Sequence, residues 1–76
     1  MTVEQKRRVL KNKVSITIAT LRKEKGVTQE TAYCDTGHHF ARLEIGKVDP
    51  QVTTIASICD YFEITISEFF DKVESL

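Results

Sequence analysis

The chain has 76 residues, which is enough for one small domain and too few for two independent hydrophobic cores. Hydrophobic residues make up 41% of the sequence and charged residues 29%, a balance typical of a folded globular domain and not of a disordered one. No apolar run approaches the roughly 20 residues of a membrane span, and the charged N-terminal residues lack the apolar stretch of a secretory signal. We therefore expect a cytoplasmic domain, residues 1–76, with no membrane partner.

The charges are unevenly distributed along the chain. Residues 1–25 hold eight basic and two acidic residues, whereas residues 26–76 hold three basic and nine acidic residues. The totals of 11 and 11 cancel, which argues against a nucleic-acid partner, but the segregation allows one basic face and one acidic face. A solvated helix whose lysines do nothing specific explains the same pattern, and charge alone does not separate the two interpretations.

The first predicted helix runs from just after Thr2 to Lys25. Thr2 and Gln5 have the spacing of a capping box, and Gly26 suits the left-handed residue that ends a helix. A run of β-branched residues makes a strand at 14–20 the competing local prediction. Charged flanks and apolar residues at steps of four, four and three favour the helix, with one inward face of Leu10, Val14, Ile18 and Leu21.

Two short helices are predicted next. Thr28 is the N-cap of a helix over 29–35, and Thr36-Gly37 is a turn signal. The third helix is expected over 38–45, ended by Gly46. Its inward residues are expected to be Phe40, Leu43 and Ile45.

Two further helices complete the chain. Asp49 as a cap and Pro50 at the first helical position predict the start of the fourth helix. Thr65 and Glu68 form a second capping box that opens the fifth. Their apolar faces are Val52, Ile55, Ile58, Cys59 and Phe62 in the fourth, and Ile66, Phe69, Phe70 and Val73 in the fifth. Five helices with short connections predict an all-α domain.

Three segments then suggest a family. They are LRKEKGVTQE at 21–30, RLEIGKVDP at 42–50 and TTIASICDYFEITISEFF at 53–70. Together they resemble the Cro/repressor-type (XRE family) helix-turn-helix DNA-binding domains of bacteria and phages, over about two-thirds of the chain. The resemblance implies a five-helix fold of the lambda-repressor-like type, with its helix-turn-helix core at 28–45. It also implies a transcriptional regulator that binds double-stranded DNA as a homodimer, by occupying an operator, with no cofactor.

The resemblance also implies where DNA is contacted. The third helix would lie in the major groove, and the N-terminus of the second helix, with its free N–H groups, would hold a phosphate. Arg22 and Glu44 match the family's buried pair between the first and third helices, so Arg22 is not counted as a DNA contact. The DNA-binding candidates are Thr28, Gln29, His38, His39, Arg42, Lys47 and Thr53, with Thr54 beside Thr53.

The sequence departs from the family's usual spacing at one place, and this departure affects the predicted DNA contacts. The stretch from Gln29 to Glu44 is about three residues shorter than the family's usual spacing, close to one helical turn. If the shortening falls at the end of the second helix, His38 and His39 keep the base-reading positions. If it falls after Gly37, at the start of the third helix, those positions are missing.

Other functions have weaker support. Cys34, His38, His39 and Cys59 offer metal ligands, but their spacing matches no common zinc pattern, so we expect no metal, two reduced thiols and a core position for Cys59. No catalytic signature is present, so we expect no enzyme. The main alternative is a protein-interaction module that keeps the fold without DNA readout, with an interface of Tyr61, Phe69, Phe70 and Leu76.

Overall fold

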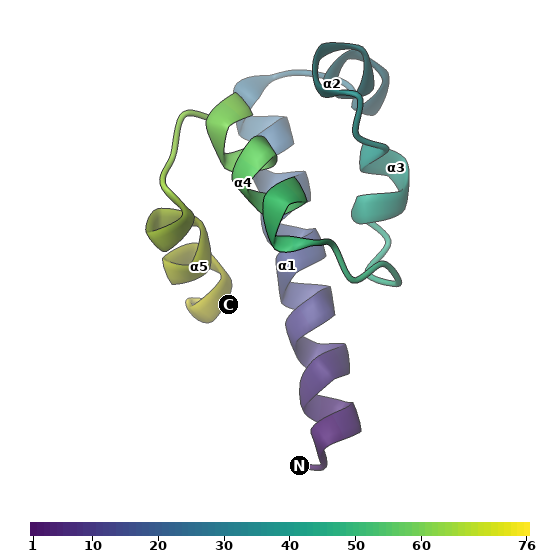
Figure 1. Ribbon diagram of the computed structural model, residues 1–76, viewed down its shortest axis with the longest axis vertical. Coiled ribbons are helices and arrows are strands. Elements are labelled where there is room, and N and C mark those ends of the chain that lie inside the picture. The colour runs from purple at the N-terminus through teal and green to yellow at the C-terminus, as the bar shows by residue number, and fades with distance from the viewer.

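The computed structural model describes residues 1–76 and contains five α-helices and no strand. The all-α, five-helix prediction is therefore confirmed. α1 packs against α5 and α3, α4 packs against α5 and α2, and α2 packs against α3, while the N-terminal half of α1 extends beyond the other helices (Figure 1). The helices are α1 (Val3–Lys25), α2 (Gln29–Thr36), α3 (Phe40–Leu43), α4 (Val52–Tyr61) and α5 (Ile66–Glu74).

The predicted caps define three of the helix starts. Thr2 with Gln5 and Thr65 with Glu68 both form complete capping boxes, and the Thr28 hydroxyl accepts a hydrogen bond from the Thr31 backbone N–H. These bonds satisfy backbone N–H groups that have no partner inside the helix. The predicted starts of α1, α2 and α5 are confirmed.

The predicted start of α4 was wrong. Asp49 and Pro50 lie in the preceding loop, and Gln51 is the N-cap residue, with an extended backbone and no capping side-chain bond. Proline fixes only φ, at a value that an extended loop shares with a helix. Pro50 is therefore compatible with either conformation and does not determine where the helix begins.

The third helix is much shorter than predicted. It spans four residues, whereas α2 extends over eight, slightly beyond the predicted 29–35. Gly37 is left-handed at φ 79° and His39 is non-helical at φ −81° and ψ 84°, so the chain enters the helix only at Phe40. His38 and His39 precede the helix instead of belonging to it.

Eleven buried hydrophobic residues from all five helices form the core. Ile18, Phe40, Ile58 and Phe69 are completely buried, and Cys59 is only 1% exposed, as its place in the α4 stripe predicts. Phe69 thus fills the core and is unavailable to a partner. This corrects the aromatic surface suggested for the interaction alternative.

Four residues of the predicted apolar faces are exposed. Leu10 is 52%, Ile45 63%, Val52 78% and Ile66 43% exposed. Leu10 lies on the core face of α1, but the other helices do not extend far enough to cover it. Ile45 follows the end of α3, in a turn instead of the predicted helix. None of the helices has the length and apolar character that crossing a membrane requires.

Candidate nucleic-acid interface

The Arg22–Glu44 pair connects the C-terminal turn of α1 to the end of α3. Arg22 Nε donates to Glu44 Oε2 at 2.6 Å, and its Nη2 donates to Oε1 at 2.9 Å. Arg22 makes a third hydrogen bond, in which Nη1 donates to the Val27 carbonyl at 2.9 Å. The two side chains are 11% and 6% exposed, and the hydrogen bond to Glu44 raises the pKa of Arg22 further. The spacing-based pair is thus a bidentate, largely buried contact.

Gln29 is attached to this pair. It is the first residue of α2, and its Nε2 donates to Glu44 Oε1 at 2.9 Å. An amide nitrogen carries two hydrogens, so one remains for another acceptor. Since Gln29 is exposed, the ion pair holds this remaining donor in place at the surface.

Thr28 contributes to the same helix start in a different way. Its hydroxyl oxygen accepts from the Thr31 backbone, and the hydroxyl donates to Thr31 Oγ1 at 3.0 Å. The side chain is therefore used by the cap. The backbone N–H groups of Gln29 and Glu30 have no partner within the helix and face an anion-favouring helix end. The exposed Glu30 side chain adds a negative charge there that opposes an anion.

A shallow depression of about 220 Å³ lies beside α3. It is open to solvent, and its wall includes three of the predicted DNA contacts as well as Thr54 from the first turn of α4. Gln29, Lys47 and Thr53 lie outside it. The lining residues are His38, His39, Arg42, Leu43, Val48 and Thr54.

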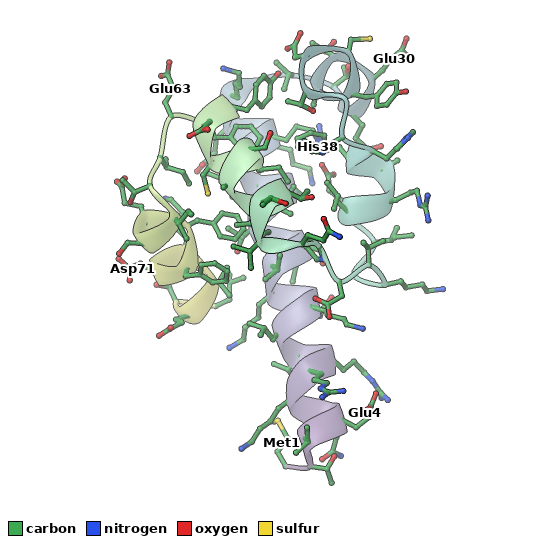
Figure 2. All side chains as sticks on the ribbon, viewed as in Figure 1. Met1, Glu4, Glu30, His38, Glu63 and Asp71 are labelled. Carbon is green, nitrogen blue, oxygen red and sulfur yellow. The ribbon has the colours of Figure 1, made fainter.

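His38 does not face outward as predicted. Its half-buried ring lies between the α2–α3 turn and α4 (Figure 2), where Nε2 is 3.0 Å from Ser57 Oγ. Its backbone N–H donates to Thr36 Oγ1 at 3.0 Å. Because Gly37 and His39 place the ring before the helix, His38 joins the turn to α4 and forms part of the floor of the depression.

The other predicted contacts are accessible. His39 is exposed and stacks on Tyr33, with ring centroids 4.6 Å apart, and Arg42 is exposed in the single turn of α3. Lys47 follows Gly46 in the loop, and Thr53 lies in the first turn of α4; both are exposed. These residues thus offer two basic side chains, one imidazole and one hydroxyl from four chain segments.

Tyr33 and Ser57 are contributors that the sequence did not indicate. Tyr33 orients His39 by stacking, and Ser57 anchors His38 by a hydrogen bond. Ser57 follows Thr54 by three residues and so shares its face of α4, which is the one signal that connects it to the surface. Both contacts cross between elements and depend on the tertiary arrangement.

The candidate metal ligands do not converge. Cys34 is exposed on α2, whereas Cys59 is buried in the core, where burial first and Asp60 second raise the pKa of its thiol. No group of three His, Cys, Asp or Glu side chains is placed to hold a metal ion.

No family model, curated protein or solved structure matches the chain.

Proposed function

We propose that the protein is a sequence-specific DNA-binding transcriptional regulator that acts as a homodimer by occupying an operator. The observation that carries the proposal is the position of Gln29. Its amide is held at the N-terminus of α2 by the Arg22–Glu44 pair, and Glu44 directly follows α3, which carries Arg42. The Arg22–Glu44 pair thus connects a hydrogen-bond donor for a DNA phosphate, the Gln29 amide, to the outward face of α3.

Each accessible group has a distinct role in the proposed complex. The free amide hydrogen of Gln29 and the α2 N-terminus bind one phosphate. Arg42 and His39 reach base edges from the major groove, Arg42 preferring guanine because its two donors match O6 and N7. Lys47 and Thr53 contact the sugar–phosphate backbone on the other side of α3.

The size of α3 restricts this readout. Four residues rise only about 6 Å, so the helix spans fewer base pairs than a recognition helix of two turns. Specificity per half-site is therefore low, and two half-sites in one dimer give a readable operator. The dimer is accordingly an essential part of the proposal.

Arg42→Ala tests the assignment of the contact surface. The arginine side chain is exposed and makes no hydrogen bond within the protein, so its loss leaves stability unchanged. We expect the affinity for duplex DNA to fall about tenfold or more, measured by fluorescence anisotropy at several salt concentrations. Lys72→Ala is the matched control, because it removes an exposed cation from α5, away from α3. Equal affinity of both variants and the wild type would refute the assignment.

An interaction module without DNA readout is the second candidate. The single turn of α3 and the balanced charge of the chain favour it. The two functions differ in low salt, where even non-specific DNA binding is strong. Absence of binding to duplex DNA at low salt would therefore favour the interaction module.

A further inference from the structure

An apolar groove opens between α1, α4 and α5, on a part of the surface that shares no residue with the depression beside α3. It encloses about 170 Å³ and is lined mainly by apolar side chains. Leu10, Val52 and Ile66 at its edge are 52%, 78% and 43% exposed. Phe70 lies half-buried in the groove, and Arg7, Lys11 and Asp49 supply its charges.

The N-terminal part of α1, residues 3–10, is called the arm; its Arg7 and Leu10 line one end of the groove. Every residue of the arm is exposed, and its N-terminal end extends beyond the other helices (Figure 1). Val3 and Leu10 are spaced by seven residues, and Leu10 precedes the buried Val14 by four, so all three lie on one face of the helix. The apolar face of α1 thus continues beyond the end of its own core, where the same chain covers Leu10 only in part and leaves Val3 68% exposed.

Charges on the arm and on α5 are complementary. The arm carries Lys6, Arg7 and Arg8 against Glu4 alone. On α5, Glu74 follows Phe70 by four residues and shares its face, and Asp71 flanks that face on the side away from α1 (Figure 2). Lys72, the only basic residue of α5, lies on the opposite side of the helix from Phe70.

We propose that the arm of a second copy of this chain occupies the groove, and that the exchange is reciprocal in a two-fold dimer. Val3 and Leu10 of each arm cover Val52, Ile66 and Phe70 of the other copy. Lys6 and Arg7, which flank the apolar face of the arm, reach Asp71 and Glu74 across the interface. This specifies the dimer that the proposed function assumes, while the contacts themselves need no DNA.

A second copy is the occupant because one chain carries both halves of the interface. A two-fold interface requires that residue i contacts j while j contacts i, and an arm and a groove on the same molecule satisfy this condition. The basic arm and the acidic flank of α5 match in sign, whereas two α5 helices placed together would repel. None of the residues that line the groove is among the candidate DNA contacts.

Reciprocal charge reversal tests the pairing in the absence of DNA. Sedimentation equilibrium is measured for the wild type, for Lys6→Glu with Arg7→Glu, for Asp71→Lys with Glu74→Lys, and for all four changes together. We expect a reversible wild-type dimer, a dissociation constant raised about tenfold or more by either pair of changes, and recovery of most of the loss in the combined variant. Lys72→Glu, on the other side of α5, leaves the dimer intact.

The apolar half of the interface has its own pair of variants. Leu10→Gln is expected to weaken the dimer about tenfold, whereas Val9→Gln, on another face of the arm, has no effect. All these positions are exposed, and circular dichroism verifies the fold of each variant. A wild-type chain that stays monomeric at about 1 mM, or a dimer unchanged by both charge reversals, overturns the proposal. A dimer that behaves as expected without binding DNA upholds it and refutes the proposed function.

Discussion

Among single residues, Arg22 has the widest influence on the structure. One guanidinium bonds Glu44 in two places and the Val27 carbonyl in a third, and Glu44 in turn holds Gln29. The same carboxylate therefore serves the packing of α1 and the orientation of a surface donor. Stability and the proposed phosphate contact depend on the same contact.

Arg22→Ala should lower stability clearly. The change leaves the Glu44 carboxylate, 6% exposed, without its cation, which costs on the order of 3 kcal/mol. For a domain of this size the melting temperature should fall by about 10 °C or more in circular dichroism. Lys23→Ala, one residue further along α1 and exposed, is the control. A melting temperature of Arg22→Ala equal to that of the control would contradict the role assigned to the pair.

Tyr61 offers a test at alkaline pH. Its hydroxyl donates to Asp35 Oδ2 at 2.6 Å, and this bond, with burial and the Asp35 charge, raises the pKa of Tyr61 from 10.0 to about 12. Folding therefore favours the protonated phenol. Its contribution to stability is complete below pH 10 and is lost as the pH rises through about 12.

Phenolate absorbance measures this directly, because Tyr33 is the only other tyrosine. In a Tyr33→Phe background, the expected midpoint lies near 12 and moves toward 10 when Asp35→Ala is added. A midpoint that stays in place in that variant would show that Asp35 is not the cause.

The helices differ in how far the sequence predicts their ends. α1, α2 and α5 begin where a threonine caps the chain, since such caps act through bonds within four residues. α4 has no side-chain cap, and the Asp49-Pro50 signal places its start too early. The length of α3 depends on how the turns at Gly37 and Gly46 meet other helices. Local pattern does not contain that information.

Gly46 illustrates such a turn. It is left-handed at φ 80°, and a Cβ there would lie 3.2 Å from Asn12 Oδ1 and from Ser15 Oγ on α1. Ser15 is buried and bonded to the Asn12 carbonyl, so it has little freedom to move. A side chain at residue 46 would therefore require Asn12 or Ser15 to shift by a few tenths of an ångström.

Gly46→Ala should cost more than Gly26→Ala. Gly26 has nearly the same φ, 78°, but open space around it. Alanine in the left-handed region costs about 1 kcal/mol at either site, and the contacts at residue 46 add about 1 kcal/mol more. Denaturant unfolding of both variants measures the difference. Equal losses of the free energy of unfolding would show that the α3–α4 loop adjusts freely.

In the whole molecule, two surfaces remain that the core does not explain. The depression beside α3 is lined by three of the candidate DNA contacts, which the resemblance of the sequence indicated. One of them, His38, points inward and contacts Ser57. Leu10 lines part of the groove beside the arm. The helical period predicts that Leu10 faces the core, but the core does not extend that far along α1 and leaves Leu10 exposed. That exposure is visible only once all five helices are assembled, because periodicity gives the face of a helix and not what covers it.

The most direct test of the proposed function is selection of the wild-type chain on a pool of random duplex DNA at two salt concentrations. We predict enrichment of one two-fold symmetric motif with short half-sites about one helical turn apart, and an affinity that falls as salt rises. Arg42→Ala should enrich the motif poorly. No enrichment at either concentration, with little binding even in low salt, would contradict DNA recognition by this fold.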